Sequence, residues 1–271
     1  MRSTIHFLVQ TNFWVAICVY SLCLSTELLL QVSNCWVSLF GFSSTLFTYC
    51  FLNLIHHKKL DFQTRKKSLA HNKNLIYALL FFSALISLYC CFNFCLETLV
   101  IIFFIAVFSA LYPFGLREVP RLKIYIISLI WSISTVILLA VENQVLFNWN
   151  LLAIFFGRFC FVFAITIPFD VRDVDRDNKE LLTIPQLIGI KKSKLLSVLI
   201  LMFFELIVIW QYLNEYIFLY QLLSVIFSCF VATFFIAKTT LDKSRFYYSF
   251  WIEGLSFVLF VGLLIANVFR Y

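Results

Sequence analysis

Glycine, proline and charged residues are all scarce in this chain of 271 residues. It contains 6 Gly and 4 Pro, which leave little material for long loops, so we expect helices joined by short turns. Only 13% of the residues are charged, whereas 62% are hydrophobic and 34 are Phe. A soluble domain of this length has one core, which cannot bury so much apolar surface. The composition therefore predicts an integral membrane protein.

The cysteines lack the spacing of a metal site or a disulfide framework. There are nine, and no two of them form a C-x-x-C pair. Most fall within apolar segments, where cysteine acts as a small packing residue. The sequence therefore predicts neither a disulfide scaffold nor a zinc site.

Apolar runs of about 20 residues predict an all-α fold, a polytopic membrane bundle of about nine transmembrane helices. The runs cover residues 7–29, 34–55, 75–93, 97–114, 124–142, 150–169, 195–213, 216–237 and 247–269. We expect a single transmembrane domain over residues 1–271. The first run has no small-residue cleavage site and more membrane segments follow it, so we expect a retained helix rather than a cleaved signal peptide.

The net charge of +7 is concentrated in alternate loops. Loops 56–74, 115–123, 170–194 and 238–246 hold 6, 3, 6 and 3 Lys or Arg, and the loops between them hold none. This positive-inside pattern predicts a cytoplasmic N-terminus and an outer C-terminus. The positive charge thus reflects the orientation of the chain in the membrane. It favours the lipid bilayer or an anionic substrate as partner over nucleic acid. The short loops favour a bacterial cytoplasmic membrane.

A dense polar run, residues 170–177, follows the sixth apolar segment and holds four Asp and two Arg. In a helix, with about 100° per residue, the spacing of Asp170, Asp173 and Asp177 places the three within roughly 60° of one another. Carboxylates that converge where a membrane helix meets water favour a hard cation, or a ligand that such a cation holds. The alternative is a charged loop in which Asp and Arg pair with one another.

A second polar stripe ends the second apolar segment. If that helix continues into the cytoplasm, Asn53, His57 and Asp61 share a stripe roughly 80° wide. Arg65 and Lys66 follow at once. The alternative is an ordinary cytoplasmic loop enriched in positive charge.

Two further features carry charge. The segment Tyr112–Lys123 holds two Pro and a Gly, which predict a loop that brings Arg117 and Arg121 to the same face of the membrane. Arg158 lies inside the sixth apolar run, where a charge is costly unless it is paired or wet. It marks a functional site, fills a structural role, or reaches toward the outer surface.

Taken together, these motifs resemble the UbiA superfamily of membrane prenyltransferases over essentially the whole chain. Asp170-x-x-Asp173-x-x-x-Asp177 matches the family's second D-x-x-D-x-x-x-D motif in full. The run Thr183–Gly189 is similar to the family's T-x-P-x-x-x-G, and Tyr112-Pro-Phe-Gly-Leu-Arg117 is similar to its Y-P-F-x-K-R loop, with Leu116 in place of the lysine.

The first motif departs from the family's N-D-x-x-D-x-x-x-D pattern. Asn53 and Asp61 match it, but Leu54 and His57 stand where two aspartates are expected. Imidazole suits Zn²⁺ and other transition metals better than Mg²⁺, so this half of the site is weaker for Mg²⁺.

The resemblance implies a prenyl diphosphate and a hydrophobic acceptor as substrates, with Mg²⁺ as cofactor. The acceptor class stays open among aromatics, quinone precursors and lipids. The implied catalytic and metal-binding residues are Asp170, Asp173, Asp177, Asn53 and Asp61. The implied diphosphate-binding residues are Arg65, Lys66, Tyr112, Arg117, Arg121, Lys123 and His57.

Three functions are open at this point. The first is an enzyme that transfers a prenyl group. The second is a membrane protein of the same fold that binds isoprenoids without transfer, which the residues Leu54, His57 and Leu116 favour. The third is a secondary transporter that uses the intramembrane charges Arg158, Glu205 and Glu253.

Overall fold

The computed structural model describes residues 2–59, 73–111, 119, 121–175 and 181–269. Every regular element among these residues is a helix, which confirms the predicted all-α class. Eight described helical spans are at least 18 residues long and apolar enough to cross a membrane, two of them built from shorter helices and a π-helical segment. A ninth apolar helix, α6 (Leu96–Leu111), is shorter. Each of these nine segments overlaps one of the nine predicted spans.

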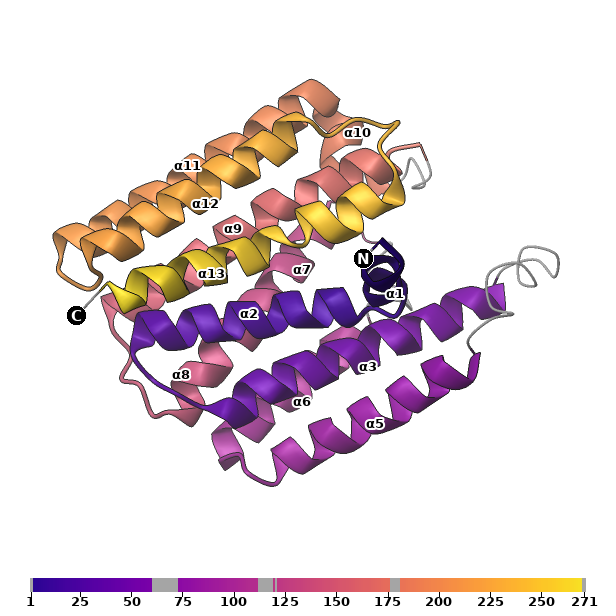
Figure 1. The fold of residues 1–271 in the computed structure, drawn as a ribbon, viewed down its shortest axis with the longest axis horizontal. Coiled ribbons are helices and arrows are strands. Elements are labelled where there is room, and N and C mark those ends of the chain that lie inside the picture. Colours follow the sequence, from indigo (N-terminus) through magenta and orange to yellow (C-terminus); the bar gives the residue numbers. More distant parts are fainter. Residues whose placement is uncertain (1, 60–72, 112–118, 120, 176–180, 270–271) are drawn as a thin grey trace.

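The N-terminal apolar run forms two helices, α1 (Arg2–Gln10) and α2 (Phe13–Leu30). Between them Asn12 has φ 60°, a left-handed conformation that Asn tolerates better than most residues. The predicted start of the first span at residue 7 was therefore wrong, because the chain turns at Asn12 before α2 begins. Figure 1 shows α1 at one end of α2, with its axis turned away from the axis of α2.

The next elements build the rest of the bundle around α9. In chain order they are α3 (Cys35–Lys59), α5 (Lys73–Cys91), α6, α7 (Lys123–Ser132), η3 (Ile133–Ile137), α8 (Leu138–Glu142), α9 (Trp149–Asp173), α10 (Ile184–Ile188), α11 (Ile190–Leu213), α12 (Leu219–Ala237), η5 (Tyr247–Ile252) and α13 (Leu255–Val268). The two η segments are π-helical turns inside otherwise α-helical spans.

Helix α9 is the centre of the molecule, since 72% of its span is buried against 11% for the peripheral α5. It packs against α7 and α11 (Figure 1). Its Phe161 lies in the main core with Leu201 and Tyr248. Gly157 allows this close approach, because a Cβ there would lie 2.8 Å from the ring of Phe204. Small residues at helix contacts are typical of membrane bundles.

A proline stands near the end of α9 without ending it. Pro168 has no N–H, so the carbonyl of Ala164 loses its usual helical donor. The hydroxyl of Ser197, on α11, donates to that carbonyl at 2.6 Å. Because Ser197 supplies the donor that the Ala164 carbonyl lacks, α9 continues as a helix to Asp173.

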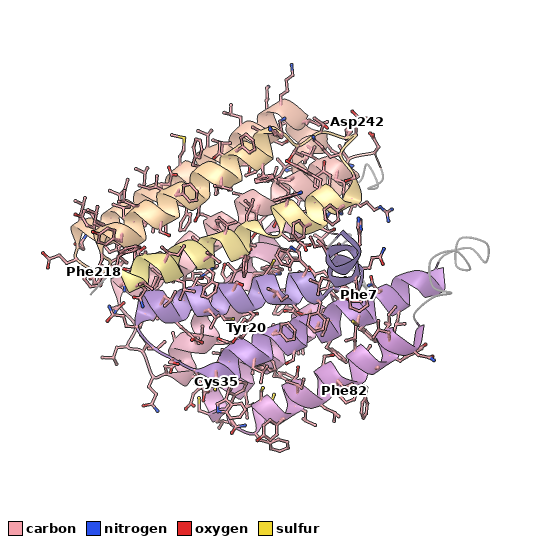
Figure 2. The ribbon with its side chains drawn as sticks, viewed as in Figure 1. Phe7, Tyr20, Cys35, Phe82, Phe218 and Asp242 are labelled. Atoms are coloured by element: carbon pink, nitrogen blue, oxygen red, sulfur yellow. The ribbon has the colours of Figure 1, made fainter. Side chains whose placement is uncertain are left out.

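The outside of the bundle is apolar. Phe82, Phe103 and Phe230 are 61%, 64% and 70% exposed, and Figure 2 shows many such side chains pointing outward. An apolar exterior of this extent fits hydrocarbon rather than water. The chain is an integral membrane protein.

Candidate functional site

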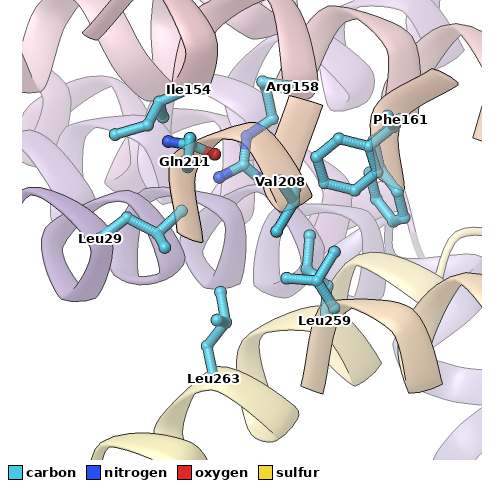
Figure 3. Close-up of a pocket in the computed structure, with 10 residues that line it drawn as sticks. Leu29, Ile154, Arg158, Phe161, Val208, Gln211, Leu259 and Leu263 are labelled. Carbon is cyan, nitrogen blue, oxygen red and sulfur yellow. The ribbon is translucent and has the colours of Figure 1, made fainter. Parts of the chain in front are cut away.

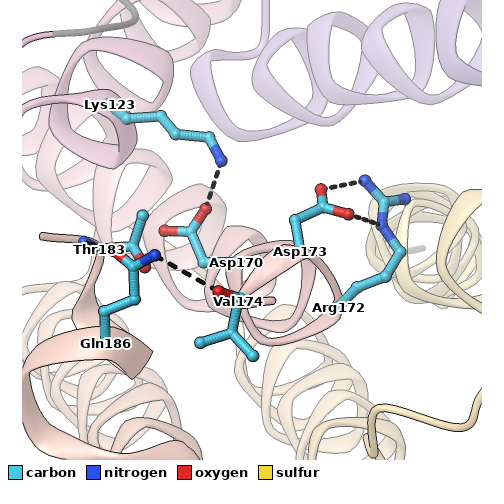
Figure 4. A network of polar contacts seen from close by, with 7 residues as sticks. All are labelled: Lys123, Asp170, Arg172, Asp173, Val174, Thr183 and Gln186. Atoms are coloured by element: carbon cyan, nitrogen blue, oxygen red, sulfur yellow. Dashed lines mark hydrogen bonds and ion pairs between the residues drawn. The ribbon is translucent and has the colours of Figure 1, made fainter. Parts of the chain in front are cut away.

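The last two turns of α9 carry two carboxylates on one face. Asp170 is almost fully buried at 2% exposure, and the Nζ of Lys123, at the start of α7, lies 2.8 Å from its Oδ1. Figure 4 shows the lysine reaching across from α7 to the aspartate. The first residue of one span thus neutralises a carboxylate near the end of another, which makes burial of that carboxylate tolerable.

Asp173 is paired within its own helix. Arg172 donates from Nε to Oδ1 at 2.9 Å and from Nη2 to Oδ2 at 2.6 Å, a bidentate arrangement (Figure 4). The guanidinium also lies over the rings of Phe169 and Tyr248, at 5.2 and 5.5 Å from their centroids. Arg172 is therefore held in place, and it presents Asp173 in a fixed position.

A short helix, α10, covers the end of α9. Thr183 precedes it, and the Thr183 N–H donates to the side chain of Gln186 at 2.9 Å. Pro185 occupies the first turn, where its missing N–H costs nothing, and Gly189 closes the helix with φ 80°, a conformation that favours glycine. Gln186 in turn donates to the carbonyl of Val174 at 3.4 Å, which ties α10 to the aspartate-bearing end (Figure 4).

A cavity of about 440 Å³ opens at this point. Lys123, Asp170, Arg172 and Asp173 line its polar end. Its apolar part lies between α7, α9 and α2 and is lined by Val15, Ile127, Ile130, Trp131, Val162 and Ile165.

A second cavity, of about 500 Å³, adjoins the first and is more apolar. It lies between α3, α5, α6 and the span from α7 to α8. The two cavities share the lining residues Thr48, Tyr49, Leu52, Ser109, Ile130 and Trp131. Together they form a space that is charged at one end and apolar through most of its depth.

No protein-family model matches the sequence, and no curated protein matches it either. Solved structures do resemble it. A UbiA homolog from Aeropyrum pernix K1 has a TM-score of 0.67 at 13% identity, with 93% of this chain and 98% of that chain covered. A UbiA homolog from Archaeoglobus fulgidus bound to GPP and Mg²⁺ has a TM-score of 0.65 at 12% identity, covering 97% and 99%. A digeranylgeranylglyceryl phosphate synthase has a TM-score of 0.62 at 13% identity and covers 99% of both chains.

The chain has the UbiA fold. The shared topology extends over nearly all residues of both chains in each comparison, although the sequences are only 12–13% identical. The predicted UbiA-like architecture is therefore confirmed.

Within this UbiA fold, three predicted site residues come together: Asp170, Asp173 and Lys123 line one cavity. Asn53 is half-buried on α3, one turn beyond Tyr49, which lines both cavities. Arg121 lies two residues before α7 and is exposed. Its backbone N–H donates to the carbonyl of Leu181 at 3.0 Å. Six predicted residues and the side chain of one more lie outside the described residues: Asp61, Arg65, Lys66, Tyr112, Arg117 and Asp177, and the side chain of His57.

Two cavity residues, Arg172 and Glu253, were not among the residues that the sequence predicted for the diphosphate or metal site. Arg172 belongs to the charged run, and its pair with Asp173 is of the kind that the alternative of mutually paired Asp and Arg predicted. The packing of its guanidinium on Phe169 and Tyr248 was not predicted. Glu253 is an intramembrane carboxylate without a sequence partner, and the fold places it on the same cavity as Asp170. The position of Glu253, a carboxylate within an apolar span, is the sequence signal that could have identified it.

Arg158 lies toward the other end of α9. Its Nη2 atom bridges α9 to α2, whereas its buried Nε and Nη1 atoms have no hydrogen-bond partner among the described residues. Arg158 is 4% exposed, and its Nη2 donates to the carbonyl of Leu22 at 3.0 Å and to the hydroxyls of Ser25 and Thr26 at 2.6 and 3.0 Å. The adjoining cavity holds only about 20 Å³, and Figure 3 shows it walled by apolar side chains with Gln211. Arg158 therefore joins α9 to α2 and does not reach the outer surface.

The donor set fits Mg²⁺. Asp170 and Asp173 present hard oxygen ligands one turn apart on a cavity wall, and Mg²⁺ is usually held by one or two carboxylates together with substrate phosphates. Among the described residues no group of three His, Cys, Asp or Glu side chains gathers, so the residues seen would hold the ion together with a phosphate ligand rather than alone.

Proposed function

We propose that this protein is an intramembrane prenyltransferase, which moves a prenyl group from its diphosphate to an aromatic, quinone-precursor or lipid acceptor. The observation that carries the proposal is the pair of joined cavities, charged at Asp170, Asp173 and Lys123 and apolar beyond. A prenyl diphosphate has the same division, with an anionic head and an apolar tail. The likeness to a UbiA homolog bound to GPP and Mg²⁺ supports it.

The charged end would bind the diphosphate. Asp170 and Asp173 would hold Mg²⁺, which when bound draws negative charge from the diphosphate and makes it a better leaving group. Lys123 and Arg172 lie beside these carboxylates and supply N–H donors for phosphate oxygens. From the family resemblance we assign supporting roles at this end to Asn53, His57, Asp61, Arg65, Lys66, Tyr112, Arg117, Arg121 and Asp177.

The apolar cavities would hold the prenyl chain and exclude water. During transfer the bond between the prenyl C1 and the diphosphate oxygen breaks, and its electron pair leaves with the diphosphate. The nucleophilic atom of the acceptor bonds to C1, and the acceptor gives up a proton. The rings of Tyr49 and Trp131 line the junction of the two cavities, where an aromatic face stabilises an allylic cation.

We infer that residues 1–271 form one such domain in a bacterial cytoplasmic membrane, with the N-terminus inside and the C-terminus outside. The alternating loop charges support this orientation. Basic residues also tie neighbouring helix ends together on the proposed inner side: Lys194 donates to the carbonyls of Ala237 and Thr239 at 2.7 and 3.0 Å.

The test is Mg²⁺-dependent diphosphate release by the purified protein in lipid nanodiscs, with prenyl diphosphates of increasing length. We expect release that chelation of Mg²⁺ abolishes and that falls at least about 100-fold in Asp170→Asn and in Asp173→Asn, because each loses a charged ligand. Asp175→Asn is the matched control, since Asp175 is exposed in the same segment. Wild-type release in both cavity variants would remove these residues from the proposal.

A second candidate, a binding protein without transfer, is favoured by two observations. Asp170 and Asp173 each already have a cationic partner, and Leu54 and His57 replace the aspartates of the first motif. This candidate predicts binding of prenyl diphosphate without release, and no release after Leu54→Asp and His57→Asp are combined. A gain of release in that double variant shows instead that the framework is catalytic.

A further inference from the structure

The small cavity beside Arg158 lies where five helices meet. It holds about 20 Å³, and the side chains that line it come from α2, α9, α11, α12 and α13. Arg158 and Gln211 are the polar residues of its wall, and the other lining residues are apolar (Figure 3). A cavity of about 10–15 Å³ already accommodates one water molecule, so this one has room for a single small ligand. The proposed prenyl transfer gives it no role.

The Arg158 guanidinium uses only one of its three nitrogen atoms in hydrogen bonds to the described residues. Its donations to the Leu22 carbonyl and to the hydroxyls of Ser25 and Thr26 all come from Nη2. Nε and Nη1 are buried and have no partner among the described residues. A buried donor without a partner is destabilising, and more so when the group is charged. Two such donors on a residue that lines a cavity favour a ligand that accepts hydrogen bonds.

The positive charge of Arg158 also lacks a counter-charge from the described part of the chain, since no described carboxylate forms an ion pair with it. Glu27 follows Thr26 on α2, but its carboxylate accepts from the hydroxyl of Ser38 on α3. Glu205, on α11, does not line the cavity. Arginine stays protonated in proteins, so Arg158 remains a cation here. A buried charge without a partner strongly destabilises the folded state.

These two properties favour an anion over a water molecule. A water molecule accepts a hydrogen bond but leaves the charge uncompensated, whereas an anion meets both needs. The cavity restricts the kind of anion. An oxyanion such as sulfate requires more room and several donors, and the amide nitrogen of Gln211 is already engaged by Asn150 at 2.7 Å. A halide ion is spherical and small, and it accepts a hydrogen bond from any direction.

We propose that this cavity binds one halide ion, chloride under physiological conditions, as the counter-ion of Arg158. The ion accepts from the guanidinium, compensates its charge and fills the space at which the five helices meet. The site is structural. It shares no lining residue with the two joined cavities, so it is independent of the proposed prenyl transfer.

Thermal unfolding in nanodiscs tests the site, with sodium chloride and sodium gluconate compared at equal ionic strength. We expect the Tm of the wild type to be about 2–4 °C higher in chloride, because a ligand that binds only the folded state stabilises it. Bromide should act like chloride. Arg158→Met removes the cation, so its Tm should be the same in chloride and in gluconate, which also controls for general effects of the salts. An equal Tm of the wild type in the two salts would overturn the proposal.

Two further variants separate the cavity from charge in general. Val208→Ile keeps Arg158 and adds one methylene to a side chain that lines the cavity, so it should displace the ion and remove the chloride effect. Lys194→Met is the control, because Lys194 also donates to backbone carbonyls but does not line this cavity. It should keep the chloride effect. A chloride effect that persists in both Arg158→Met and Val208→Ile places the ion elsewhere and overturns the site.

Bromide locates the ion directly, because it scatters X-rays anomalously. Crystals of the wild type grown in sodium bromide should show an anomalous peak within hydrogen-bond distance of Nε or Nη1 of Arg158. Electron density there without an anomalous signal would mean that water fills the cavity, and that result contradicts the halide site. Either negative result leaves the proposed transfer standing, since diphosphate release is measured at the other end of α9.

Discussion

Helix α9 carries a buried charge toward each of its ends, and the two have opposite surroundings. Arg158 is bound by a backbone carbonyl and two hydroxyls beside a cavity of about 20 Å³. Asp170 is paired with a lysine from another helix beside a cavity of about 440 Å³. We therefore propose the substrate-binding site at the buried charge that has space and a further charge beside it, and not at the other. The one at Arg158 holds two helices together.

The largest effect that separates the two centres is expected at Lys123. Lys123→Met removes the cation that pairs with Asp170 and supplies a donor for the diphosphate, so the KM for prenyl diphosphate should rise about 10–100-fold. Lys123→Met should also lower the free energy of unfolding, by at most about 3–5 kcal/mol, since the buried Asp170 loses one cationic partner. Initial rates of diphosphate release and thermal unfolding in nanodiscs measure both.

Lys123→Arg is the control, because it keeps the charge and should retain most of the wild-type stability. An unchanged KM in Lys123→Met would show that the lysine stabilises the fold without contacting substrate.

A smaller effect is expected where α9 passes its proline. Ser197→Ala leaves the Ala164 carbonyl without a donor, so it should cost about 1–3 kcal/mol of unfolding free energy. In a Pro168→Ala background the new N–H can bond that carbonyl, so the same serine substitution should cost less than about 1 kcal/mol. A double-mutant cycle by thermal or denaturant unfolding measures the coupling. Equal costs in both backgrounds would mean that the serine does not replace the missing helical donor.

The smallest effect is expected at Arg158. Arg158→Met should change diphosphate release less than about threefold and stability by less than about 2 kcal/mol, because it removes a buried charge while conserving much of the volume. Ser25 and Thr26 keep their own bonds to the Leu22 carbonyl, at 2.7 and 3.1 Å. Release assays beside Lys123→Met give the direct comparison. A loss in Arg158→Met as large as that in Lys123→Met would contradict the difference drawn between the two ends of α9.

Much of the fold could be predicted from the sequence because hydrophobic runs of membrane length have one main explanation. The spacing of Asp170 and Asp173 likewise predicted a shared face, since it needs only that α9 continue to this point. The sequence also shows that Pro168 cannot donate a helical hydrogen bond. That the Ser197 hydroxyl replaces this donor depends on how α11 packs on α9.

The remainder of the site depends on contacts between distant segments. No local pattern shows that Lys123 pairs with Asp170, or that the π turn before Glu253 brings that residue to the same cavity. The break at Asn12 was missed because Phe7, Leu8 and Val9 near the end of α1 extend the apolar pattern of α2. Periodicity describes single helices, whereas cavities arise between them.

Binding of a prenyl diphosphate tests the central claim most directly, because it does not depend on turnover. Isothermal titration of GPP into the protein in nanodiscs, with Mg²⁺ and with chelator, should show binding that requires Mg²⁺. The double variant Asp170→Asn/Asp173→Asn should lose it, whereas Asp175→Asn and Arg158→Met should keep it. Binding of equal strength in the double variant, or binding in wild type that ignores Mg²⁺, would contradict the placement of the diphosphate at the end of α9.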